Sequence, residues 1–178
     1  LARAKKEEVS FSPEAGWDDV KLKTFRRHIV ELGKTGFTFI YDELEAEEPV
    51  TWSYLLHTVT NPMNVNMVNE FVHVQATSKN GISDAYLLGS DELKTDTTSQ
   101  FFTPATNWLR ADDKGNFKKY PNHWHFTATS GKHKVYRFVT IINTHINKTT
   151  PDKPFAVPQR LKDGSIKMGS WIIRSEEH

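Results

Sequence analysis

The sequence contains no cysteine, which excludes disulfide bonds and thiolate metal sites. It also lacks a long apolar run, since none approaches the roughly 20 residues of a membrane-spanning helix. An excess of one charge sign is absent too, because 23 basic and 22 acidic residues leave a net charge of +1. Without a strong net charge, no global field favours nucleic acid or a membrane surface as a partner.

The length of 178 residues fits one domain that buries a substantial core without disulfide bonds. No stretch of eleven or more residues shows a helical period, whereas short alternating segments recur between turn signals. We therefore predict an all-β fold, an antiparallel β-sandwich in which residues 1–178 form a single domain. Because the chain begins at Leu1 in a charged stretch, we expect a C-terminal fragment of a longer protein.

The clearest strand pattern predicts three strands, at residues 25–30, 37–42 and 50–57. The acidic run 43–48 predicts a solvated turn, and Pro49 marks a break because it cannot donate a ladder hydrogen bond. In the third strand, Trp52 and Tyr54 share one face, while His57 ends the strand on the other. Further strands are predicted at residues 71–77, 84–89, 123–129, 134–143 and 166–174, with residues 90–99 as a loop.

Several features of residues 25–58 recur together in one enzyme family. A strand with Arg26 and Arg27 leads through a short turn into a hydrophobic strand ending in Tyr41 and Asp42, and a later strand closes on a Leu-Leu-His57 sequence. The run FRRHIVELGKTGFTFIYDELEAEEPVTWSYLLHT resembles the β-domain of the heparinase II/III-like polysaccharide lyases. Residues 124–145 add a looser likeness. The resemblance implies antiparallel sheets behind an α/α toroid, in a bacterial enzyme that is periplasmic or secreted.

Enzymes of this family cleave uronate-containing polysaccharides by β-elimination, which needs a general base, a general acid and a group that offsets the carboxylate charge. In the family these groups lie in the toroid and in an early strand of the β-domain, and none of those motifs occurs here. Tyr41 and Tyr54 lie in core-like strand patterns. We therefore expect no catalytic residue and no lyase activity of this chain alone. The implied partners are an acidic polysaccharide and the upstream helical domain of the same parent chain.

The resemblance also implies a structural zinc ion, because the family histidine at the position of His57 is one of its ligands. Imidazole suits zinc, and three protein ligands plus water are a common arrangement. The partner ligands come from earlier strands in the family, in a segment that would precede Leu1, so the implied site is incomplete here. The alternative is a strand-end histidine with ordinary hydrogen bonds.

A second signal is the pair His123 and His125, which a strand displays on one face about 7 Å apart. The pair is open to three interpretations: a metal site, contact with an acidic sugar, or a half-exposed strand face. Trp124 and Phe126, on the opposite face, are expected in the core.

Residues 108–125 interleave aromatic and basic side chains. Aromatic faces stack on sugar rings, and arginine binds carboxylate or sulfate through its planar fork. The candidate substrate-binding residues are Trp108, Arg110, Tyr120, His123 and His125. The alternative is a solvated loop anchored by its aromatics. Arg26, Arg27 and His28 suggest a similar role, but we interpret them as a solvated face or edge guard. The competing function is a non-catalytic carbohydrate-binding or adhesion module.

Overall fold

The computed structural model describes residues 21–32, 36–59, 61–99, 110–111, 114–115, 117–118, 123–146 and 156–174. The strands in chain order are β1 Leu22–Glu31, β2 Phe37–Thr58, β3 Asn64–Val68, β4 Phe71–Thr77, β5 Gly81–Gly89, β6 Lys94–Thr98, β7 Arg110–Ala111, β8 Phe117–Lys118, β9 Trp124–Ile146, β10 Gln159–Arg160, β11 Ile166–Met168 and β12 Trp171–Ile173. In this part of the chain, no helix has the length and apolar character needed to cross a membrane. The predicted all-β fold with antiparallel sheets is confirmed.

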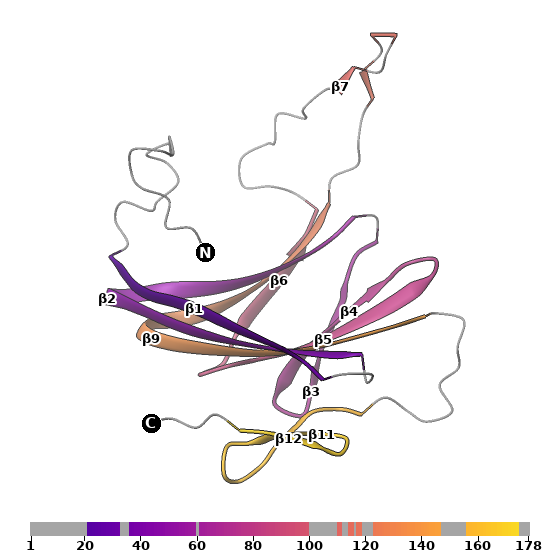
Figure 1. The fold of residues 1–178 in the computed structure, drawn as a ribbon. Coiled ribbons are helices and arrows are strands. Elements are labelled where there is room, and N and C mark those ends of the chain that lie inside the picture. The colour runs from indigo at the N-terminus through magenta and orange to yellow at the C-terminus, as the bar shows by residue number, and fades with distance from the viewer. Residues whose placement is uncertain are drawn as a thin grey trace.

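The main sheet has seven strands in the order β1-β2-β9-β5-β4-β3, with β6 also paired to β9. Strand β9 pairs with β2 over almost its whole length, with β5 through its C-terminal half and with β6 through its N-terminal half. Figure 1 shows β2 and β9 as long curved ribbons, with the small sheet β10-β11-β12 beyond one face of the main sheet. All of these pairings are antiparallel.

Strand β2 is continuous where the sequence predicted two strands and an acidic turn, so the predicted turn is wrong. Leu44 and Ala46, inside the acidic run, are buried. The alternation of glutamate with Leu44 and Ala46 was therefore a strand signal. The register shifts between Glu45 and Val50, so the strand bends through a bulge without ending. Pro49 lies within this bulge, where its missing N–H interrupts no ladder pair.

Strand β9 likewise joins two strands that were predicted separately. Lys132 and His133, in the expected connection, pair with Thr51 and Val50 of β2. Residues 94–98 form β6 and not a loop, and β9 is its partner. The predicted strand at residues 166–174 is a hairpin, because Gly169 takes a φ of 59° and turns the chain between β11 and β12.

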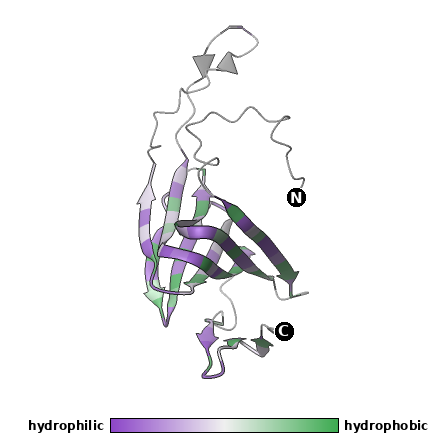
Figure 2. Ribbon diagram, turned by 90° about the vertical axis from the view of Figure 1, so that its left-hand side faces the viewer, coloured by the Kyte–Doolittle hydropathy of each residue, from purple (hydrophilic) through white to green (hydrophobic). Residues whose placement is uncertain are grey.

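Each face of the main sheet carries a buried hydrophobic cluster. The inner face carries a cluster that includes Leu44, Trp52, Leu87, Phe126, Tyr136 and Phe138. On the outer face, Phe71, Tyr86 and Ile141 pack against Ile166 and Met168 of the small sheet. Figure 2 shows hydrophobic and hydrophilic residues interspersed along the strands, as period-two alternation requires. Tyr54 and Phe126 are buried, as predicted, and so is Trp52 on the same strand face as Tyr54. Trp124 packs against the same cluster.

Candidate functional site

The structure brings His57 and His125 side by side as cross-strand partners on β2 and β9. Their ring centroids are 4.6 Å apart and their planes meet at 85°. Burial, followed by the neighbouring His57 and His123, lowers the pKa of His125 and favours its neutral form. Among the described residues, no group of three or more histidine, aspartate or glutamate side chains is arranged to hold a metal ion. These residues therefore do not supply the three-ligand set that the implied zinc needs.

The other predicted glycan-binding residues fall mostly beyond the described side chains. Trp108 and Tyr120 lie outside the described residues. The backbone of Arg110 belongs to β7, opposite Lys118 of β8. His123 is exposed just before β9. A role for these residues in sugar binding stays a prediction.

A groove with a volume of about 360 Å³ lies between the outer face of the main sheet and the small sheet. Its apolar lining consists of Phe39, Leu88, Val139, Ile166 and Ile173. Its polar side chains are His28, Tyr41, Ser90, Arg137, Arg160 and Arg174. Three guanidinium groups around an apolar floor suit an anion that also carries a nonpolar surface.

Strand register explains why these groups meet. His28 of β1 lies opposite Tyr41 of β2, and Tyr41 lies opposite Val139 of β9. Because directly opposed residues point to the same face of a sheet, this row delivers an imidazole, a phenol and an isopropyl group to the groove. The rings of His28 and Tyr41 have centroids 6.0 Å apart.

The adjacent row holds Arg26, Glu43 and Arg137. Oε1 of Glu43 lies 2.7 Å from Nε2 of His28 and 3.8 Å from Nη1 of Arg26, while Oε2 lies 4.0 Å from Nη2 of Arg137. The hydrogen bond with His28, and then the charges of Arg26 and Arg137, lower the pKa of Glu43. Glu43 is therefore an ionised carboxylate shared by three basic side chains. Two of them, His28 and Arg137, line the groove.

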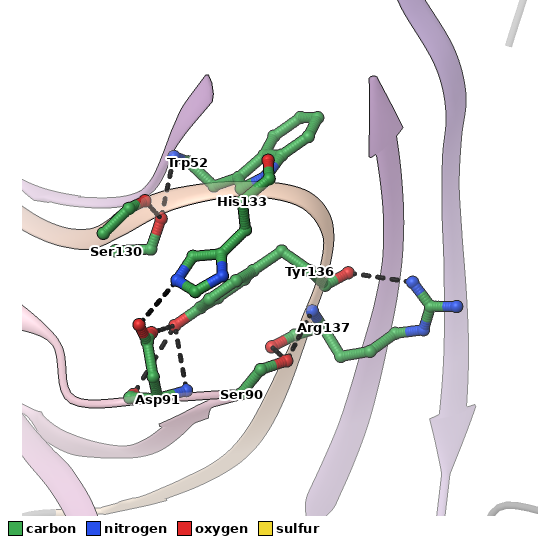
Figure 3. A network of polar contacts seen from close by, with 8 residues as sticks. Trp52, Ser90, Asp91, Ser130, His133, Tyr136 and Arg137 are labelled. Carbon is green, nitrogen blue, oxygen red and sulfur yellow. Dashed lines mark hydrogen bonds and ion pairs between the residues drawn. The ribbon is translucent and has the colours of Figure 1, made fainter. Parts of the chain in front are cut away.

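Arg137 is held in place by backbone contacts. Its Nη1 donates to the carbonyl oxygens of Tyr136 at 3.0 Å and Leu44 at 3.4 Å. Its own N–H donates to Oγ of Ser90 at 2.9 Å, and Ser90 belongs to the groove wall (Figure 3). The guanidinium group is thus presented in a fixed position, which lowers the entropy lost when it binds an anion.

A polar cluster next to Ser90 fixes the wall that contains this residue (Figure 3). Asp91 accepts a hydrogen bond of 2.6 Å from the hydroxyl of Tyr136, and its other oxygen lies 2.6 Å from Nε2 of His133. The Tyr136 hydrogen bond is the main reason that the pKa of Asp91 is lowered. A Cβ atom on Gly89 would collide with the Tyr136 hydroxyl, so glycine is required for this close approach.

The charges around the groove do not cancel. Asp163 lies 3.7 Å from Arg174, and Glu43 is within 4.0 Å of Arg137. Arg160 forms no ion pair with any residue that the structure describes. One guanidinium group is therefore left to receive an external anion.

Sequence reasoning missed most of this groove. Tyr41 was placed in a core-like pattern, but its side chain is only partly buried and lines the groove. His28 is exposed, in agreement with its interpretation as part of a solvated face, but its place in the groove was not predicted. Arg137, Arg160 and Arg174 were not singled out. No local signal marks them, because they lie on separate elements that only strand pairing in the main sheet and docking of the small sheet bring together. A scan against protein-family models finds no match, and no curated protein matches the chain.

Proposed function

We propose that this chain is a β-domain that binds an acidic polysaccharide in the groove between its two sheets. The observation that carries this proposal is the set of three arginines beside an apolar floor. Guanidinium groups pair with carboxylate or sulfate, and the nonpolar lining covers the C–H face of a sugar ring. Arg160, which no described carboxylate neutralises, is the first contact for the ligand's acidic group.

We further propose that the parent protein is a polysaccharide lyase of the heparinase II/III-like type, periplasmic or secreted, which cleaves uronate-containing chains by β-elimination. The sequence resemblance over residues 25–58 supports this assignment. The domain by itself is expected to be inactive. Two of its tyrosines, Tyr54 and Tyr136, are buried, and desolvation is the main cause that raises the pKa of each. Neither tyrosine is therefore suited to be the general base or the general acid of a β-elimination on a polysaccharide.

The second candidate function is a carbohydrate-binding or adhesion module with no catalytic partner. One observation favours it: the groove draws its arginines from both sheets of the domain, Arg137 from the main sheet and Arg160 and Arg174 from the small sheet and its C-terminal end. Cleavage of polysaccharide by the full-length protein distinguishes the two functions. The parent reading frame of a lyase encodes an upstream helical domain, and its full-length product releases unsaturated uronate, whereas an adhesion module does neither.

Calorimetric titration with uronate oligosaccharides, at low and moderate salt, tests binding. We expect Arg160→Ala to weaken binding about tenfold, since a hydrogen bond between charged groups contributes on the order of 1.5–3 kcal/mol. Lys167→Ala is the matched control. Lys167 neighbours Ile166 of the groove, so it points to the opposite side of the small sheet. Absence of wild-type binding, or equal losses in both variants, would contradict the proposal.

A further inference from the structure

We propose that Glu43 is a built-in counter-ion of the groove, displaced from its basic partners by the acidic group of the ligand, so that anion binding is coupled to proton uptake. This inference rests on the proposed function, because it concerns the regulation of the same groove. It assigns a role to a carboxylate that stands beside the anion site without lining it.

The geometry places Glu43 in competition with any bound anion. Its carboxylate contacts His28 and Arg137 at 2.7 and 4.0 Å, and both of these residues line the groove. A ligand acid that approaches them also approaches Glu43. Two carboxylates close together cannot both stay ionised at low cost. The side chain of Glu43 is 24% exposed, so it has a route to solvent when the ligand takes its partners.

The surroundings of Glu43 determine the sign of the coupling. On β2, Tyr41 and Glu45 flank it on the same face, and Glu45 is paired with Lys23 at 3.6 Å. Strand β1 contributes Arg26 and His28, β9 contributes Arg137, and the small sheet brings Arg160, Arg174 and Asp163 across the groove. In the free protein these cations keep Glu43 ionised. A bound anion takes up part of their charge and favours protonation of Glu43.

Proton uptake on binding means that affinity rises as pH falls. The rise ends where the ligand's own carboxylate becomes protonated, near its ordinary pKa of about 3.5. A sulfated ligand has no such limit in this range. The pH profile therefore reports which acidic group occupies the groove.

The test compares wild-type protein with Glu43→Gln and Glu45→Gln, using a tetrasaccharide of galacturonic acid as the probe. Titrations at pH 5.5 and 7.5, in buffers of different ionisation enthalpy, give both the affinity and the number of protons taken up. Glu45→Gln is the matched control. It removes the same charge two residues further along β2, from a carboxylate whose partner is Lys23 and not a groove residue.

We expect Glu43→Gln to bind about fivefold more tightly at pH 7.5, as the removal of one competing charge at a partly exposed site allows. It also takes up fewer protons than wild type, whereas Glu45→Gln behaves like wild type. Glu43→Ala should change affinity in the same direction, and melting curves verify that each variant is folded.

Two results overturn the inference while leaving the proposed function intact. One is wild-type binding that Glu43→Gln weakens or leaves unchanged, which makes Glu43 a support for His28 and Arg137 and not their competitor. The other is an equal gain in Glu45→Gln, which makes the effect one of overall charge. If neither wild type nor Glu43→Gln binds the probe, the proposed function and the inference both fail.

Discussion

The hydroxyl of Tyr136 donates a 2.6 Å hydrogen bond to Asp91, although the tyrosine ring is fully buried in the core and Asp91 is exposed. This bond ties the interior of the main sheet to the segment after β5. The neighbouring Ser90 contacts the backbone of Arg137, so the same tie positions the groove. Loss of the bond is expected to affect stability and ligand binding together.

A double-mutant cycle between Gly89 and Tyr136 measures this close contact. We expect Gly89→Ala to lower the free energy of unfolding by about 1–3 kcal/mol, because the new methyl group meets the Tyr136 hydroxyl. In the Tyr136→Phe background the oxygen is gone, so the same substitution should cost less. Urea unfolding of the four proteins gives the coupling energy. A coupling near zero would show that the segment moves aside without strain.

Asp91 should make stability depend on pH in the acid range. Its folded-state pKa is lowered, chiefly by the Tyr136 hydrogen bond, so the unfolded chain binds the proton more tightly. The stabilisation is therefore present above the unfolded pKa of 3.8 and is lost as pH falls through the folded value. We expect wild type to be more stable than Asp91→Asn at pH 6. This difference in stability should become smaller below pH 4. Thermal melts across that range provide the measurement. A difference in melting temperature that does not change with pH would contradict the role of Asp91 in the pH dependence.

Arg27 and Asp42 form a bidentate ion pair on the inner face of the main sheet. Nε and Nη2 of Arg27 donate to the two oxygens of Asp42 at 2.6 and 2.8 Å, and Asp42 is only 2% exposed. Arg27→Ala leaves this carboxylate without its counter-ion, and we expect a loss of about 3 kcal/mol in unfolding free energy.

The neighbouring Arg26 serves as the control for this prediction, because its side chain is exposed and lies 3.8 Å from a partly exposed Glu43. Arg26→Ala should cost no more than about 1 kcal/mol. Chemical denaturation distinguishes the two variants. Similar losses would mean that Asp42 recovers its stabilisation from water or from another donor.

His125 predicts a pH effect near neutrality. Burial and the adjacent His57 lower its folded-state pKa, so the unfolded chain binds more protons in this range. The sign follows from proton linkage: stability falls as pH drops below the unfolded value of 6.5 and stops falling below the folded value. His125→Gln should remove this loss between pH 7 and 5. An unchanged pH profile in the variant would place the titration on another histidine.

Period-two alternation predicted the faces of the strands well. Phe71 and Val72 point into different clusters, and Trp52 and His57 lie on opposite faces, as expected. The acidic composition of residues 43–48 favoured a turn, whereas their period-two alternation fits the strand that forms there. The groove was beyond sequence reasoning for another reason. His28, Arg137 and Arg160 share no local pattern, and only the strand order and the packing of Ile166 against Ile141 bring them together.

The central place of β9 also constrains how the chain acquires its fold. Phe37 of β2 pairs with Asn143 of β9, which lies far along the chain. Strands β5 and β6 also pair with β9, so they cannot complete their hydrogen bonding before it is synthesised. During synthesis, the earlier strands therefore leave the ribosome with their hydrogen-bonding edges uncovered until residues 124–146 follow. Contacts between such distant positions slow folding, and exposed edges invite pairing with other chains. The nascent protein should therefore depend on chaperones until β9 has emerged.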